Sequence, residues 1–171
     1  MAKRTHYYDP IDRSPGRLAG NSRNWGDAPQ EVKEKVKEMI INEAKNNNLS
    51  ERDIAHILAI ADFESGFNPD AANPDSTASG IGQFIDTTWK EFGKGDAFDA
   101  QANIKALVKE YIVIKNKINR LGLSEEYIYK LHHDGIYSIE TGVDSGGLSI
   151  SKSKVMPLVE KYYAFLSQNE Y

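Results

Sequence analysis

The chain of 171 residues contains no cysteine, which excludes disulfide bonds, thiolate metal sites and cysteine nucleophiles. Long apolar runs are also missing. The longest run covers residues 57–61, and a helix that spans a bilayer needs roughly 20 apolar residues. We therefore expect no stable insertion into a membrane.

A strong excess of positive charge is absent as well. The net charge is −4, which gives no general attraction to nucleic acid or to an anionic membrane, so we expect no nucleic-acid partner. The first residues carry basic side chains but no apolar segment follows them, and we expect no secretory signal peptide. The composition, with 40% hydrophobic and 27% charged residues, is that of a globular chain.

Residues 1–28 differ from the rest of the chain. They are rich in proline, glycine, asparagine and serine and lack apolar periodicity, which predicts a basic extended N-terminal arm. Its basic residues outnumber its three aspartates and are Lys3, Arg4, Arg13, Arg17 and Arg23. Two interpretations remain open: a strap on the surface of the domain, or an arm that docks onto a larger assembly or an anionic surface.

Residues 29–171 form a single predicted domain of mainly α class. Apolar residues at helical spacing predict five to six helices, with a small Gly-rich loop or β insert over residues 66–86. The helices are predicted from Pro29, from the Ser50 N-cap to Gly66, over residues 87–92, over 99–121, from the Ser124 N-cap to Gly135, and over 155–166. Residues 135–153 are predicted to form a loop.

Glu64 is the first candidate catalytic residue. It follows Ile57 by seven positions and Ile60 by four, so on a helix it emerges from the apolar face, whereas Asp62 points roughly the opposite way. Loss of hydration on this face favours the protonated carboxyl, which is the form that general-acid catalysis requires. A structural glutamate at a fraying helix end is the alternative.

Two further segments carry polar groups suited to a ligand. Gly80 and Gly82 bracket Ile81 and permit close backbone approach, and the Gln83 amide is suited to the hydroxyl or acetamido groups of sugars. His132, His133 and Asp134 suggest a metal site. However, adjacent histidines on a helix point about 100° apart, which favours structural or supporting roles and no metal.

Together and in this order, Glu64-Ser65, the segment Gly80 to Phe84 with Thr88-Trp89, and residues 132–135 resemble the catalytic domain of lytic transglycosylases and goose-type lysozymes. This family is glycoside hydrolase family 23 (SLT domain), and the motifs have the form of its bacteriophage branch. The resemblance covers about residues 50–137 and implies a lysozyme-like fold with an active-site cleft beside the insert. It departs at Gly82, where the family has methionine, and at His132, where it has tyrosine.

The resemblance implies a bacteriolytic, cell-wall-degrading glycosidase that cuts the β-1,4 bond between N-acetylmuramic acid and N-acetylglucosamine in peptidoglycan. Glu64 would act as acid and then base in a lytic transglycosylase that forms 1,6-anhydro ends. Ser65, Gln83, Phe84, Tyr129 and His132 would bind or position the glycan, and Tyr129 is the alternative hydrogen-bond donor to Glu64. No metal or organic cofactor is implied.

Two alternatives accompany this prediction. A hydrolysing lysozyme, or muramidase, would need a second carboxylate for water, and Asp75 and Asp86 of the insert are the candidates. A non-catalytic module of the virion that binds peptidoglycan is the alternative from another class.

Without a signal peptide, delivery to the cell wall would depend on a phage. The expected protein is a monomer made in the cytoplasm of the infected host. It would reach the periplasm or the cell wall either as an endolysin released by a holin or as a virion component. In the virion role, the arm would contact virion proteins.

Overall fold

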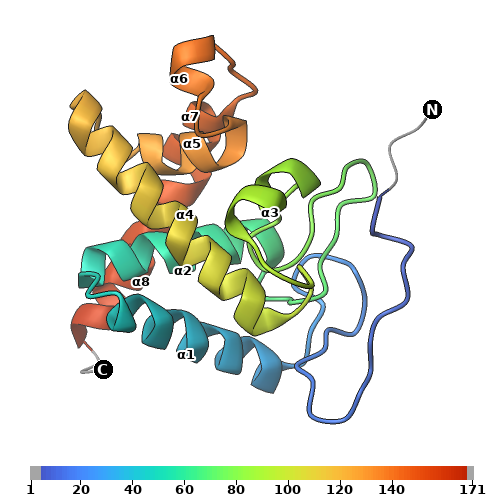
Figure 1. Ribbon diagram of the computed structural model, residues 1–171. Helices are drawn as coiled ribbons and strands as arrows, with labels where there is room; N and C mark the ends of the chain where they lie inside the picture. Colours follow the sequence, from blue (N-terminus) through green and yellow to red (C-terminus); the bar gives the residue numbers. More distant parts are fainter. Residues whose placement is uncertain (1–4, 169–171) are drawn as a thin grey trace.

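The computed structural model describes residues 5–168 and is mainly helical (Figure 1). The described helices are, in chain order, α1 (Gln30–Asn46), α2 (Glu51–Ser65), α3 (Asp86–Phe92), α4 (Ala100–Leu121), α5 (Tyr127–Asp134), α6 (Ser138–Thr141), α7 (Gly147–Ile150), the π-helical turn η1 (Ser151–Val155) and α8 (Met156–Gln168). The Gly-rich insert forms isolated bridges between Ala72 and Ser79 and between Ser79 and Phe84, without a strand in the described residues. The predicted mainly α class is confirmed.

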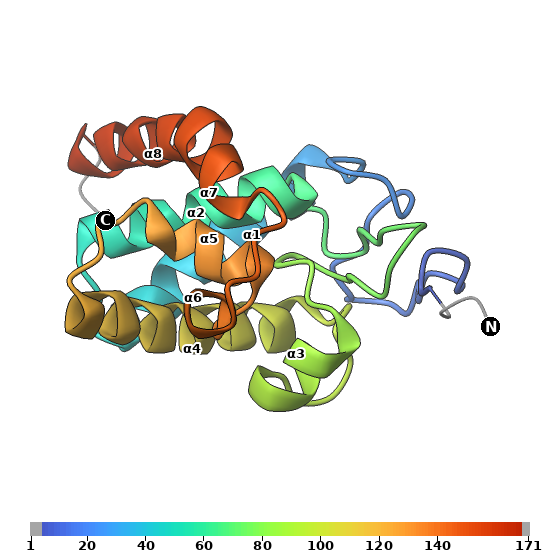
Figure 2. The same ribbon diagram turned by 90° about the horizontal axis from the view of Figure 1, so that it is seen from above.

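Helix α2 lies at the centre of the fold. Its middle residues, 54–61, are all buried, and it packs against α8, α1 and α4 (Figure 2). A helix that is buried on all sides reads as apolar around its whole circumference, which explains why the longest apolar run of the sequence falls here. Within residues 5–168, no helix has the length and apolar character needed to cross a membrane.

Local sequence signals set both ends of α2. The Ser50 hydroxyl accepts the backbone N–H of Asp53 at 3.1 Å, and the Asp53 carboxylate accepts the backbone N–H of Ser50 at 3.0 Å, which together form a capping box. Gly66 ends the helix in the left-handed conformation, with φ 59°. The helix therefore stops directly after Glu64 and Ser65 and holds both residues in its last turn.

The prediction for residues 135–153 was wrong in part. This segment contains α6 and α7, of four residues each, and the first residues of η1. Single helical turns are too short to show an apolar repeat, so the sequence pattern does not reveal them. The predicted N-cap Ser124 instead begins a turn, in which its carbonyl accepts the N–H of Tyr127 at 3.1 Å, and α5 begins at Tyr127.

Residues 5–28 form no helix and pack along one end of the domain (Figures 1 and 2). Their anchor is Asp70 of the insert, whose side chain is fully buried. Arg17 binds both carboxylate oxygens of Asp70 at 2.7 and 2.9 Å, Arg23 approaches at 3.4 Å, and the Gly20 N–H donates at 2.7 Å. Two of the arginines that make the segment basic are therefore engaged within the chain. Residues 1–4 of the predicted arm and residues 169–171 of the predicted domain lie outside the described residues.

We expect Asp70→Ala to destabilise the protein strongly. The variant leaves Arg23, which is 7% exposed, without its anionic partner, and removal of one member of a buried ion pair costs about 3–5 kcal/mol. Urea denaturation followed by circular dichroism measures the loss. The matched control is Glu38→Ala, which breaks the exposed pair of Glu38 with Lys35 and should change the free energy of unfolding by about 0.5 kcal/mol or less. Equal effects of the two variants would contradict this prediction.

Candidate active site

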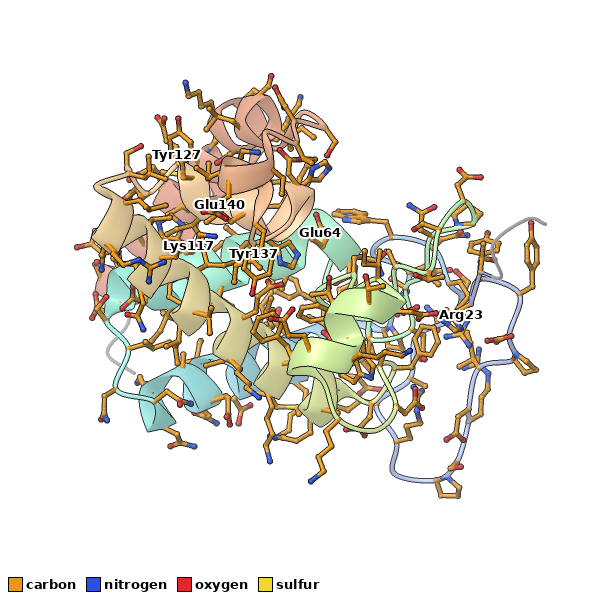
Figure 3. The ribbon with its side chains drawn as sticks, turned by 45° about the horizontal axis from the view of Figure 1, so that its top comes forward. Arg23, Glu64, Lys117, Tyr127, Tyr137 and Glu140 are labelled. Atoms are coloured by element: carbon orange, nitrogen blue, oxygen red, sulfur yellow. The ribbon has the colours of Figure 1, made fainter. Side chains whose placement is uncertain are left out.

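Glu64 lies at the end of α2 and lines a cavity of about 240 Å³ (Figure 3). The walls come from the Gly-rich insert, the start of α3, the middle of α4 and the end of α5. The Glu64 residue keeps part of its surface exposed, as an acid that faces a cleft must. Asp62 projects from the other side of α2, where its carboxylate accepts the Tyr162 hydroxyl at 2.6 Å.

Burial raises the pKa of Glu64 above its ordinary value. The positive charge of the nearby His132 and the hydroxyl of Tyr129, which donates to Glu64 Oε1, oppose this rise without cancelling it. Burial and Glu64 in turn raise the pKa of Tyr129, which keeps its hydroxyl protonated as a donor. The site therefore holds a carboxyl group that retains its proton to a higher pH than an exposed glutamate does.

His132 is held between two acceptors. Its Nε2 lies 2.9 Å from the carbonyl oxygen of Gly82, and its Nδ1 contacts the Glu110 carboxylate. Burial of the ring works against its charge, but the Glu110 carboxylate and the Gly82 carbonyl outweigh burial and raise the pKa of His132 to about 9. His132 is therefore an imidazolium at neutral pH and fixes the Gly82 backbone.

Asn103 of α4 also holds the segment that contains Gly80 and Gly82. Its Oδ1 accepts the Gly82 N–H at 2.8 Å, while its Nδ2 donates to the Ala97 carbonyl at 2.8 Å. A Cβ on Gly80 would lie 2.2 Å from Asn103 Nδ2, and Gly80 has φ +80°. The first glycine of the motif is thus required by close packing against α4 as well as by its backbone conformation.

The structure places the other predicted binding residues in different ways. Gln83, with φ 53°, donates its amide to the carbonyls of Ala71 and Gly80 at 2.9 Å each, which leaves Oε1 as the amide atom available to the cavity. Ser65 is fully buried, and its hydroxyl donates to the Ala61 carbonyl at 2.9 Å. The Ser65 side chain therefore supports the last turn of α2 and does not face the cleft.

The two predicted aromatic contacts are mostly internal. Phe84 is 2% exposed and packs against Trp89 and His132, at 5.8 Å between ring centroids in each case. Tyr129 is also 2% exposed, and Phe63 covers it edge-on at 5.5 Å. In this structure neither ring presents a free face to a sugar, and Tyr129 contributes its hydroxyl to Glu64 instead.

The two predicted second carboxylates lie away from the cavity. Asp75 and Asp86 are both exposed, and neither lines the cavity walls. Asp86 accepts a hydrogen bond from His6 Nε2 at 2.9 Å, so it connects the N-terminal segment to the start of α3. The structure does not bring either residue to Glu64.

Glu110, His133 and Asp134 also line the cavity. His133 and Asp134 belong to the motif over residues 132–135 but were not predicted to bind the glycan, and Glu110 was not predicted at all. Lys130 donates to Asp134 at 2.7 Å, and Ser145 and His133 donate to its other oxygen. Burial opposes the charge of Asp134, but these donors together hold its pKa far below the ordinary value. Glu110 had a signal in the sequence, because it falls on the apolar stripe of α4, three residues after Leu107 and four before Ile114.

Among residues 5–168, no three histidine, aspartate or glutamate side chains group in a way that could hold a metal ion. A partly desolvated glutamic acid in a cleft is suited to the general-acid role that such a residue has in lysozyme-like glycosidases.

Comparison with known proteins agrees with this class. The profile of the phage tail lysozyme family matches residues 35–127, which is more than half of the chain, and the chain belongs to this family. No curated protein and no solved structure matches the chain. The lysozyme-like fold and the bacteriophage relationship predicted from the motifs are confirmed, and the family indicates a peptidoglycan-degrading, lysozyme-like activity.

We expect Tyr129→Phe to raise the pKa of Glu64 further, because the variant removes a donor that stabilises the carboxylate and leaves burial in place. A pH titration of the Glu64 carboxyl carbon by NMR measures the change. Tyr162→Phe is the matched control, since it removes a hydroxyl from Asp62 on the other side of α2 and should leave the Glu64 titration unchanged. A Glu64 titration that does not move in Tyr129→Phe would contradict the assigned contact.

The raised pKa of His132 predicts a loss of stability in alkaline solution. A group whose pKa is raised on folding stabilises the folded state below its unfolded pKa, here 6.5, and that stability is lost as the pH rises through about 9. The free energy of unfolding, measured by urea denaturation at several pH values, should therefore fall across this window. Glu110→Gln should reduce this dependence of stability on pH, because burial then lowers the pKa of His132 without the opposing Glu110 carboxylate. An unchanged slope would contradict the role given to the ion pair.

Proposed function

We propose that the protein is a lytic transglycosylase that cleaves the β-1,4 bond between N-acetylmuramic acid and N-acetylglucosamine in peptidoglycan. One observation carries the proposal. Of the acidic side chains that line the cavity within the described residues, Glu64 alone makes no ion pair, whereas Glu110 is held by His132 and Asp134 by Lys130. The site thus offers one carboxyl group that is free to exchange a proton.

In the first step, the protonated Glu64 gives its proton to the glycosidic oxygen, and the bond from that oxygen to C1 of N-acetylmuramic acid breaks. The acetamido oxygen of the same sugar bonds to C1 and takes up the developing positive charge. A second enzyme carboxylate is not needed in this substrate-assisted route. The raised pKa of Glu64 supplies the protonated form, and Gln83 Oε1 is placed to accept a hydrogen bond from the bound glycan.

In the second step, Glu64 acts as a base. It takes the proton of the C6 hydroxyl while O6 attacks C1 and displaces the acetamido oxygen, which closes the 1,6-anhydro ring and restores the protonated acid. His132 keeps the Gly82 backbone in place, and the Tyr129 hydroxyl stabilises the carboxylate form of Glu64 between the two steps.

A hydrolysing lysozyme is the second candidate, and the description of the family as a lysozyme favours it. An inverting hydrolase needs a carboxylate base that activates water from the opposite face of the sugar. Asp75 and Asp86 do not line the cavity, and Glu110 and Asp134 are each paired with a cation. This arrangement supports the transglycosylase over the hydrolase.

Digestion of purified sacculi, followed by mass spectrometry of the products, tests the reaction. We expect 1,6-anhydro ends, each lighter by one water than the reducing ends that a hydrolase leaves. Glu64→Gln should lower the rate of clearing by at least about 100-fold, since general acid–base catalysis contributes on the order of 10²–10⁴-fold. Asp75→Asn and Asp86→Asn should keep the activity.

The outcomes separate the three candidate functions. Reducing ends would establish the hydrolase, and an inactive Asp75 or Asp86 variant would then identify its base. Wild-type protein that binds sacculi without clearing them would support the non-catalytic module.

We further propose that the enzyme acts on the cell wall as a component of the virion, which the family description as a tail lysozyme supports. The N-terminal segment would then contact virion proteins. Mass spectrometry of purified particles should detect the chain in stoichiometric amounts. Its presence only in the lysate, with none in the particles, would favour an endolysin released by a holin.

A further inference from the structure

Trp25 is a large, exposed aromatic residue that the proposed reaction does not use. Its side chain belongs to the N-terminal segment and is 61% exposed to solvent. An exposed tryptophan leaves a large apolar surface in water, and tryptophan is enriched at binding interfaces.

The Trp25 indole is fixed at the end of α2. Its Nε1–H donates to the carbonyl oxygens of Asp62 and Phe63, at 3.0 Å to each. These are the two residues that precede Glu64 in the chain. Because the polar atom of the indole is bound in this way, its exposed surface is the hydrocarbon face of the ring system.

Backbone contacts on both sides of Trp25 connect it to two segments that lead into the cavity. On one side, the Gly26 N–H donates to the Ser65 carbonyl at 2.9 Å, next to Glu64. On the other side, the Arg23 carbonyl accepts the Ala72 N–H at 2.9 Å, and Ala72 precedes the cavity-lining residue Asn73. Trp25 therefore bridges two segments that each continue directly into the wall of the cavity.

Close packing leaves the ring little freedom. A Cβ on Gly66 would lie 3.0 Å from Trp25 Cε2 and 2.7 Å from Gly26 Cα. The helix end and the N-terminal segment thus meet through two glycines, and the indole rests against the α2 terminus while 61% of the residue stays exposed. A rigid aromatic face of this kind loses little conformational entropy when it binds a ligand.

The cavity is too small to hold a glycan strand, so the strand must also contact residues outside it. Its volume of about 240 Å³ lies below the roughly 300–1,000 Å³ of typical small-ligand pockets, so a bound polymer must extend past its rim. The axial C–H groups of a pyranose form a flat apolar face that matches an exposed indole. The rings of Phe84 and Tyr129, at 2% exposure each, cannot offer such a face inside the cavity.

We infer that Trp25 is a glycan-binding residue that stacks on an N-acetylated pyranose of the strand just outside the cavity. The inference deepens the proposed function and rests on it. It gives the N-terminal segment a direct part in substrate binding, in addition to its packing on the domain.

Binding to a tetramer of β-1,4-linked N-acetylglucosamine tests this role, measured by isothermal titration calorimetry in the Glu64→Gln background so that no cleavage occurs. We expect Trp25→Ala to weaken binding about tenfold, which is about 1.4 kcal/mol. Trp25→Phe should retain most of the affinity. Phe165→Ala, which removes another exposed aromatic on α8, is the control and should bind like its parent.

The phenylalanine variant separates stacking from a structural role. Phenylalanine keeps an aromatic face but cannot donate to the carbonyls of Asp62 and Phe63. If Trp25 acted only by capping α2, Trp25→Phe would lose as much affinity as Trp25→Ala, and that result would overturn the inference. Unchanged binding in Trp25→Ala would overturn it as well.

Fluorescence gives a second, direct measurement. The chain has two tryptophans, so Trp89→Phe leaves Trp25 as the single reporter. In the Glu64→Gln background, the tetramer should shift the emission of Trp25 to shorter wavelength, and an unchanged spectrum at saturating tetramer would contradict stacking.

The clearing of sacculi tests the proposed function separately. If Glu64→Gln still clears them, the catalytic assignment fails whatever Trp25 does, and if only the Trp25 effects are missing, the further inference alone fails.

Discussion

The active site depends on a row of buried polar side chains along one face of α4. Asn103, Glu110 and Lys117 follow one another at intervals of seven residues, which places them on one face over about 21 Å of helix. Asn103 holds the Gly82 backbone, and Glu110 holds His132. Lys117 donates to the Ile136 carbonyl, and it also donates at 2.7 Å to Glu140 (both side chains are labelled in Figure 3). Burial of these groups without partners would be costly, so each one ties a loop or a short helix to the rigid α4.

Glu64 is not part of this row on α4, but the charges that the row holds affect its environment. Glu110 of this row is paired with His132, and Asp134 is paired with Lys130 on α5, whereas Glu64 has a neutral donor, Tyr129. A desolvated carboxyl without an ion pair keeps its proton to a higher pH than an exposed one, and an adjacent hydroxyl stabilises the carboxylate when the proton leaves. The proposed acid–base role of Glu64 therefore depends on the pairing of the neighbouring acids with cations, while Glu64 itself has no such partner.

The sequence predicted the fold more completely than it predicted the candidate site. The apolar periodicity of α1, α2, α4 and α8 predicted helices whose ends agree closely with the structure, because burial of one face is a local property of the sequence. The hydrogen-bond partners of the site residues could not be predicted in the same way. Ser65 and Gln83 are polar residues in a motif, but the sequence could not tell that Ser65 bonds to its own helix or that the Gln83 amide is taken up by Ala71 and Gly80.

By itself, the sequence determined the helical class, the cap and stop of α2, and the emergence of Glu64 from an apolar face, since each of these depends on neighbours within a few turns of one chain segment. The tertiary structure decided the rest. It separated Asp75 and Asp86 from the cavity, paired Glu110 with His132, and set Trp25 beside the end of α2. These relations join residues that are tens of positions apart, and only the packing of whole elements fixes the distance and the dielectric environment between such groups.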